Sequence, residues 1–156
     1  ILIEYNICHD TKCAGFNQHF GKDNVVRNNI FAFGKEEQIS RGRRENHRSF
    51  VFEYNIVYFT EGQAVKAGYA GGPFTPADAI FRRNVYHNPA GGALDFAGLS
   101  FESWQESGQD EGSIVADPQF VNPNARDFTL KAASPARSIG FVPIDLSAAG
   151  PRRTAG

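Results

Sequence analysis

The chain has 156 residues, 41% of them hydrophobic and 21% charged, and a formal net charge of −1. This length is sufficient for one domain with a substantial core. The near-zero net charge gives no electrostatic reason to expect a nucleic acid or an anionic membrane as partner. Because the apolar runs are only a few residues long, no transmembrane helix is predicted.

One short pattern occurs four times along the chain: an apolar residue, two polar or aromatic residues, an asparagine and a β-branched residue. The copies are Ile3–Ile7, Val26–Ile30, Phe52–Ile56 and Phe81–Val85. Their asparagines are Asn6, Asn29, Asn55 and Asn84, at separations of 23, 26 and 29 residues. Such spacing is typical of a solenoid, in which each coil buries its apolar face only against its neighbours. We therefore predict an all-β parallel solenoid of about five coils.

Aligned on the asparagines, the copies form columns that parallel stacking would bring into contact. The residue after each Asn is β-branched and the residue three places before it is apolar, so both columns are expected in a continuous core. Asn tolerates left-handed backbone angles and can bond to a stacked Asn, which favours a structural ladder over catalysis. Two places before each Asn, charges of alternating sign predict a ladder of ion pairs, with recognition of an acidic sugar as the alternative. That column is Glu4, Arg27, Glu53 and Arg82.

The segments that follow the copies carry Gly, Pro, Asn and charges, and we predict that they are loops leaving one corner. They are 11–22, 34–48, 60–77 and 89–112. Loops stacked on one edge form a wall, where solenoids often carry their function. A short helical turn is predicted within 35–48, and Trp104 is expected to anchor the longest loop.

The C-terminal part is predicted to end the stack. A fifth coil is expected at Ile114–Pro118 with Asp117 in the Asn column, and Asp127–Lys131 as a short strand. We expect a single domain over 1–156, with coils to about residue 131 and an irregular cap and tail over 132–156. The repeat is in full register at residue 1 and the chain contains no Met. We therefore also expect that N-terminal coils of the same protein precede this sequence.

Cys8 and Cys13 are the only cysteines. A disulfide between them would close a very short loop and gain little over the strain it stores, so two unlinked thiols are expected. Two thiols without a second pair do not predict a zinc site.

Three stretches together resemble a known family: Asp23–Gly34, Asp117–Val121, and Arg126–Lys131 with Ser134–Ala136. They are similar to the C-terminal portion of bacterial right-handed parallel β-helix proteins of the pectate-lyase-like superfamily. The superfamily includes polysaccharide lyases, glycoside hydrolases, epimerases and non-enzymatic surface proteins. The resemblance implies a right-handed β-helix that acts on a plant or algal polysaccharide and is secreted, periplasmic or on the cell surface. Fold alone does not determine the chemistry.

The richest polar cluster lies between residues 9 and 23, and it supplies candidates for catalysis. Asp10 stands at the exit of the first coil, where the other copies have no carboxylate. A glycosidase needs two carboxyls across the sugar, so we predict Asp10 with Glu53 or Glu61 as acid and base. His19 would position the substrate or share proton transfer. The structural alternatives are a turn carboxylate for Asp10, a packed ring for His19 and a ladder rung for Glu53.

Sugar contacts are expected from His9, Phe20 and Trp104, and exposed loop aromatics also include Phe16 and Tyr69. The remaining acids of the loops (Asp78, Asp95, Glu102 and Asp110) are expected to be caps or solvated charges. No metal or cofactor is predicted. Gly108–Gly112 could hold Ca²⁺, but its oxygen ligands do not have the spacing of a recognised Ca²⁺ loop.

The sequence thus favours a carbohydrate-active β-helix protein that hydrolyses glycosidic bonds and has a polysaccharide as its partner. The many acids and the lack of a Lys/Arg cluster beside one acidic patch favour a hydrolase over a lyase. The alternatives are a polysaccharide lyase and a non-catalytic carbohydrate-binding or structural surface module. These coils alone are expected to be inactive, because a cleft normally spans more of them.

Overall fold

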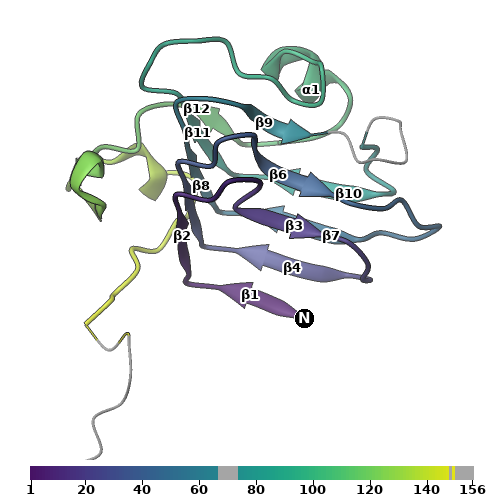
Figure 1. The fold of residues 1–156 in the computed structure, drawn as a ribbon, viewed down its shortest axis with the longest axis horizontal. Coiled ribbons are helices and arrows are strands. Elements are labelled where there is room, and N and C mark those ends of the chain that lie inside the picture. The colour runs from purple at the N-terminus through teal and green to yellow at the C-terminus, as the bar shows by residue number, and fades with distance from the viewer. Residues whose placement is uncertain (67–73, 148, 150–156) are drawn as a thin grey trace, which may run out of the picture.

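The chain folds into an all-β parallel solenoid with almost no helix, as predicted (Figure 1). It has about four turns, close to the five coils predicted. The computed structural model describes residues 1–66, 74–147 and 149. Successive turns contribute short strands to three parallel sheets. We call them sheet A (order β1-β4-β7-β10), sheet B (β12-β11-β8-β5-β2) and sheet C (β3-β6-β9).

The bounds of the strands follow the repeat. Sheet A contains β1 Leu2–Glu4, β4 Asn24–Arg27, β7 Phe50–Glu53 and β10 Ala79–Arg82. Sheet B contains β2 Ile7–His9, β5 Ile30–Ala32, β8 Ile56–Tyr58, β11 Val85–His87 and β12 Ile114–Val115. Sheet C contains β3 Phe16–Gln18, β6 Glu37–Arg41 and β9 Gln63–Lys66. The register pairs the repeat copies residue for residue, with Val26 between Ile3 and Phe52.

The segments predicted as loops contain regular structure. Segments 11–22, 34–48 and 60–77 each include a strand of sheet C, so their prediction as loops is wrong in part. The helical turn predicted within 35–48 is also wrong, because Glu37–Arg41 forms β6. Helix α1, Phe101–Glu106, lies in the longest segment and begins at Ser100, whose side chain accepts the Ser103 N–H. Sheet C, formed by these segments, thus closes the side of the coil that sheets A and B alone would leave open.

Apolar side chains form two clusters on opposite faces of sheet B. The cluster inside the coil includes Val26, Phe31, Phe52, Val57, Phe81 and Tyr86. The cluster outside the coil includes Ile30, Ile56, Val85, Phe120, Phe128 and Phe141. The column after each Asn is thus apolar as predicted, but it points away from the coil interior, because successive strand residues point to opposite faces.

The C-terminal segment covers this outer face of sheet B. Strands β13 (Phe120–Asn122) and β14 (Asp127–Leu130) form an antiparallel pair, which confirms the predicted strand near 127–131. They are joined by the 3₁₀ turn Pro123–Ala125, and a second 3₁₀ turn, Pro135–Arg137, follows. Figure 1 shows this segment on one side of the sheets rather than at the end of the stack.

The register predicted for the fifth coil is wrong. Val85 pairs with Ile114, so Ser113 rather than Asp117 stands in the Asn column. The Ser113 Oγ accepts the Asn84 N–H at 2.7 Å, in the place of an Asn carboxamide. A hydroxyl can therefore end the ladder where the repeat pattern no longer shows an Asn.

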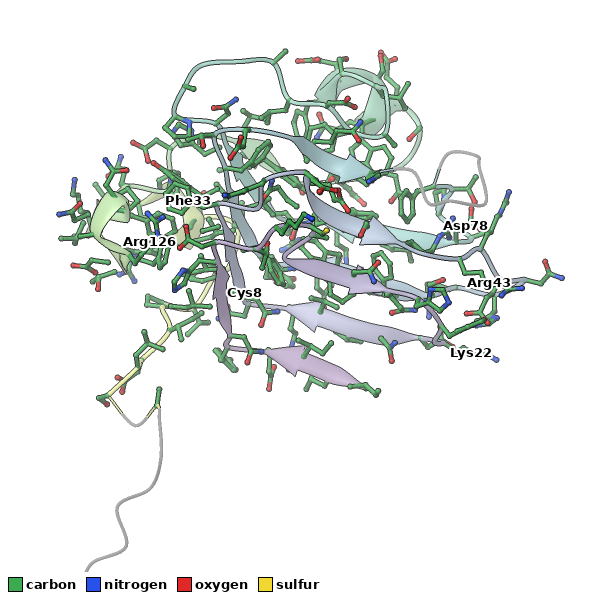
Figure 2. All side chains as sticks on the ribbon, in the orientation of Figure 1. Cys8, Lys22, Phe33, Arg43, Asp78 and Arg126 are labelled. Atoms are coloured by element: carbon green, nitrogen blue, oxygen red, sulfur yellow. The ribbon has the colours of Figure 1, made fainter. Side chains whose placement is uncertain are left out.

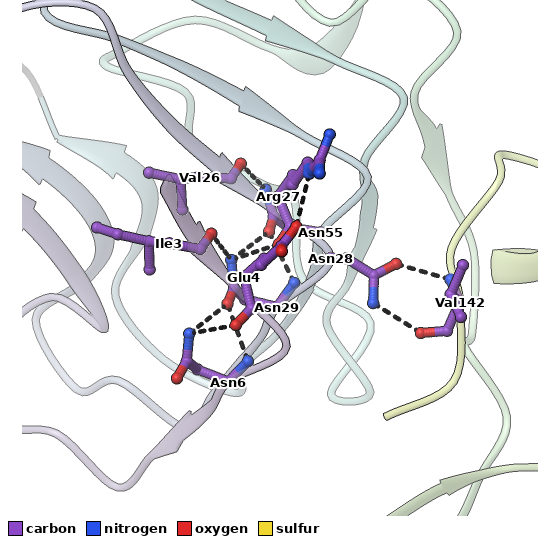
Figure 3. A network of polar contacts seen from close by, with 9 residues as sticks. All are labelled: Ile3, Glu4, Asn6, Val26, Arg27, Asn28, Asn29, Asn55 and Val142. Carbon is purple, nitrogen blue, oxygen red and sulfur yellow. Dashed lines mark hydrogen bonds and ion pairs between the residues drawn. The ribbon is translucent and has the colours of Figure 1, made fainter. Parts of the chain in front are cut away.

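The asparagines form the predicted ladder at the corner between sheets A and B (Figure 3). The Asn29 and Asn55 backbone N–H groups donate to the carboxamide oxygen of the next Asn, each at 2.9 Å. The side-chain Nδ2 of Asn55 donates to the Val26 carbonyl of the preceding coil, also at 2.9 Å. The left-handed backbone belongs to the residue before each Asn, one place earlier than predicted. Those residues are Tyr5, Asn28, Tyr54 and Arg83, with φ of 51 to 57°.

Candidate functional site

The four residues predicted for acid–base chemistry lie at three different corners of the solenoid. Asp10 and Glu61 follow strands β2 and β8, where sheet B turns toward sheet C. Glu53 ends β7 at the A–B corner, and His19 follows β3 at the C–A corner. Among the residues that the structure describes, no hydrogen bond or ion pair joins any two of these four. They therefore do not form one constellation.

Asp10 is paired with the C-terminal segment. The Arg126 guanidinium donates from Nε to Asp10 Oδ2 at 2.6 Å and from Nη2 to Oδ1, and His9 Nδ1 also lies 2.6 Å from Oδ2. The same guanidinium lies over the Phe33 ring, 4.1 Å from its centre. Figure 2 labels both residues at the same end of the sheets. The bonds from Arg126 and then His9 lower the pKa of Asp10 to about 2. Asp10 is therefore ionised at neutral pH and ties the β13–β14 hairpin to the first coil.

Glu53 is a rung of the charge ladder that the sequence predicts. Arg82 Nε donates to Glu53 Oε2 at 2.7 Å, and Arg27 Nε donates to Glu4 Oε2 at 2.8 Å. A β-bridge between Arg82 and Glu111 extends the alternation to a fifth rung. The ladder runs beside the Asn column along the same corner, and only 10% of the Glu53 side chain is exposed.

Trp104 is fully buried, so its expected exposure is wrong, and that of Phe16 is wrong as well. The Trp104 indole Nε1 donates to Asp110 Oδ2 at 2.6 Å, which confirms that it anchors the longest loop. Asp110 also accepts from Asn84, Tyr86 and Ser113, so it ends the Asn ladder inside the protein. Desolvation raises the pKa of Asp110. Asp110 is therefore buried and is not a solvated charge. Its carboxylate is also not open to Ca²⁺, because it accepts hydrogen bonds from donors of the protein.

The other candidates are dispersed over the surface. His9 shares an outward column with Ala32, Tyr58 and His87, and its ring lies 5.6 Å from the Phe128 ring of the hairpin. Glu61 is exposed at its turn. Tyr69 lies outside the described residues. Cys8 and Cys13 are free thiols, as predicted.

His19 and Phe20 come together at the C–A corner, beside the segment that joins β6 to β7. The two rings meet edge to face at 4.6 Å and 84°, and the Arg43 guanidinium lies 5.1 Å from the centre of the Phe20 ring. Phe20 is nevertheless 57% exposed. Gly42 makes room for this arrangement, since a Cβ there would lie 2.7 Å from His19 Nδ1.

Basic side chains gather at the same corner. They are Lys22, Arg41, Arg43, Arg44 and Arg48, against the acids Asp23, Glu45 and Asp78. Figure 2 shows Lys22, Arg43 and Asp78 here, at the opposite end of the sheets from Arg126. Ion pairs between coils, Arg48 to Asp23 and Arg44 to Asp78, both at 2.9 Å, hold the turns together. A Lys/Arg cluster is thus present after all. The sequence indicates this cluster in the run Arg41–Arg48, in which four of eight residues are Arg.

Two of these cations have no carboxylate partner in the described part of the chain. Lys22 and Arg43 form no ion pair there, in contrast to Arg44 and Arg48. A polar column of sheet C, with Asn17 and Ser40 in register, leads to this corner, and Ser40 Oγ donates to Asn17 Oδ1 at 3.0 Å. The corner therefore combines an exposed ring, two unpaired cations and neighbouring amide and hydroxyl groups.

Within residues 1–66, 74–147 and 149, no three His, Cys, Asp or Glu side chains are grouped as metal ligands. No helix of that part is long and apolar enough to cross a membrane. Comparisons with protein-family models, curated proteins and solved structures found no match to this chain. The fold and surface define a parallel β-solenoid with a covered sheet B and an aromatic, arginine-rich corner.

Proposed function

We propose that this β-solenoid binds a polysaccharide at the C–A corner. The observation that carries the proposal is the Phe20 ring, which is more than half exposed although His19 and Arg43 hold it in place. A single exposed apolar side chain is ordinary, but one that is fixed from two sides offers a rigid face to a sugar ring at low entropic cost. Lys22 and Asn17 would supply hydrogen bonds to the sugar substituents.

Binding has more support than hydrolysis or elimination by the predicted residues. Asp10 and Glu53 lie at different corners and each bonds to an arginine, and His19 lies at a third corner. Glu61 shares the corner of Asp10, but no hydrogen bond or ion pair joins the two in the described part of the chain. A hydrolase or lyase needs its acid and base around one sugar. We therefore propose a non-catalytic binding module, and a polysaccharide ligand implies a secreted, periplasmic or cell-surface setting.

The test is a panel of neutral and acidic polysaccharides presented to the protein in affinity electrophoresis. We expect retardation by at least one of them, and a loss of affinity of about tenfold or more in Phe20→Ala, because the stacking face is removed. Val121→Ala is the matched control, since Val121 is 48% exposed on the hairpin. The proposal would be contradicted if Phe20→Ala and the wild type were retarded equally. It would also be contradicted if no polysaccharide of the panel retarded the wild type. New reducing ends or unsaturated, ultraviolet-absorbing ends would instead favour a hydrolase or a lyase.

A further inference from the structure

A groove runs along the A–B corner, on a different side of the solenoid from Phe20. It contains two hollows, of about 330 and 250 Å³. Arg82, Arg83 and Glu111 line the first, and Tyr5, Arg27 and Tyr54 line the second. Segment 138–142 forms the opposite wall of both.

The wall is fixed to the coil by a pair of hydrogen bonds that resembles strand pairing. Asn28 Nδ2 donates to the Val142 carbonyl and Asn28 Oδ1 accepts the Val142 N–H, both at 2.7 Å (Figure 3). Gly140 of the same segment lies against Tyr54, where a Cβ would approach the ring to 3.1 Å. The groove is therefore built from two segments that the fold holds together, with a residue separation of 114.

Three guanidinium groups line the groove, and each has N–H donors that no carboxylate accepts in the described part of the chain. Arg27 and Arg82 bond to Glu4 and Glu53 through Nε, and their terminal nitrogens make no hydrogen bond within the described residues. Their side chains are 45% and 50% exposed. Arg83 forms no ion pair in that part of the chain, and its guanidinium lies 5.9 Å from the centre of the Tyr54 ring. Such forks match the two oxygens of a carboxylate or sulfate.

Aromatic rings accompany these cations. Tyr5 and Tyr54 belong to the left-handed column, two coils apart, and Tyr5 is 49% exposed. At the parallel strand spacing, two coils correspond to about 10 Å. A ring face and a guanidinium fork on adjacent rungs suit a sugar that carries an acidic group.

We propose that the A–B groove binds a sugar residue bearing one oxyanion, a carboxylate or a sulfate, within a polysaccharide. The three arginines are balanced by Glu4, Glu53 and Glu111, so the groove has no excess of positive charge for a dense polyanion. Recognition depends on a local fork rather than on a basic patch. The site is independent of the C–A corner and does not rest on the function proposed for it.

The test is calorimetric titration of the whole chain with two acidic hexasaccharides, one of uronic acid and one sulfated, and with their methyl-esterified and desulfated forms. We expect binding of at least one acidic form, which identifies the anion, and at least tenfold weaker binding of its neutral form. The proposal would be overturned if both acidic hexasaccharides failed to bind at millimolar concentration. It would also be overturned if a neutral form bound as tightly as its acidic form. Tighter binding of a DNA oligonucleotide would overturn it as well.

Arg83→Asn is the variant to compare, because Asn tolerates the left-handed backbone at this position. We expect Arg83→Asn to lower the affinity for the acidic hexasaccharide at least tenfold, and Arg83→Lys to recover part of that affinity. Lys131→Ala, on the hairpin, is the control and should bind with the affinity of the wild type. Arg83→Asn binding with undiminished affinity would refute the site. Phe20→Ala separates the two surfaces, since it should leave this affinity unchanged whether or not the C–A corner binds sugar. If Arg83→Asn does not fold, Tyr5→Ala takes its place, with the same expected loss and the same contrary result.

Discussion

At the A–B corner, one left-handed residue and the asparagine after it determine how each coil continues. The left-handed residues before the four Asn are Tyr5, Asn28, Tyr54 and Arg83, and Gly112 occupies the same place before Ser113 with φ of 70°. A left-handed conformation costs about 1–2 kcal/mol in a non-glycine residue. The buried carboxamide ladder offsets that cost, because the side chains of Asn29, Asn55 and Asn84 each satisfy a backbone N–H and a carbonyl of the preceding coil.

The ladder should be most sensitive at its centre. Asn55→Ala removes the acceptor of the Asn29 N–H and the donor to the Val26 carbonyl, both buried. We expect a loss of about 3 kcal/mol in the free energy of unfolding by urea, at about 1–3 kcal/mol for each unsatisfied group. Asn6→Ala, at the exposed end of the ladder, should cost less than about 1 kcal/mol. Equal losses in the two variants would contradict the ladder.

The Asp10–Arg126 pair predicts a pH dependence at the acidic end. The pKa of Asp10 falls from an ordinary 3.8 to about 2 in the folded state, so the ionised form favours folding. This contribution is complete above about pH 4 and is lost as the pH falls through 2. In Arg126→Gln, NMR titration of the Asp10 carboxyl should give a pKa closer to 3.8. An unchanged pKa in that variant would show that Arg126 does not hold this carboxylate.

At the scale of elements, the repeat predicted sheets A and B and their register, whereas the strands of sheet C lie outside the repeat. Strands β3, β6 and β9 have the sequences FNQ, EQISR and QAVK, which share no pattern, since polar side chains such as Gln38 are buried among them. Similarly, nothing in Ser113 marks it as a substitute for Asn. The ladder roles of Glu53 and the Asn column follow from spacing, but the groupings of Asp10 with Arg126 and Phe20 with Arg43 depend on contacts between coils.

Two side chains of helix α1, Trp104 and Gln105, donate hydrogen bonds to Asp110 at the end of the ladder, and the bond from Trp104 is buried. Trp104→Phe removes the indole N–H that Asp110 accepts at 2.6 Å while keeping most of the apolar packing. We expect a loss of about 2 kcal/mol in unfolding free energy, because a buried carboxylate loses a donor. Glu102→Gln, in the exposed first turn of the same helix, should change it by less than about 0.5 kcal/mol. A loss for Trp104→Phe as small as that of Glu102→Gln would mean that α1 contributes little to the end of the stack.

For the whole molecule, the C-terminal segment and the coils form one structure because sheet B is apolar on both faces. The outer cluster joins Ile30 and Ile56 of the coils to Phe120 and Phe128 of the hairpin. This leaves sheet A, sheet C and the corners between the sheets as the surfaces open to a ligand. The two proposed sites lie at two of those corners.

Removing one hairpin ring should therefore affect the entire chain. Phe128→Ala should lower the unfolding free energy by about 3–5 kcal/mol while preserving a single transition, since Phe128 is only 6% exposed. Phe20→Ala, at 57% exposure, should stay within about 0.5 kcal/mol of wild type, so that its effect on sugar binding can be measured in a folded protein. A separate early transition in Phe128→Ala would show that the C-terminal segment unfolds independently.

The most direct test of the account is amide hydrogen exchange of the wild-type chain with and without the polysaccharide that binds it best in the panel. The structure predicts added protection in the segments that build the C–A corner, 19–23 and 42–48. The hairpin strands β13 and β14 should exchange at unchanged rates. Protection confined to the hairpin, or none at the corner under saturating polysaccharide, would contradict the assignment of binding to Phe20 and its neighbours.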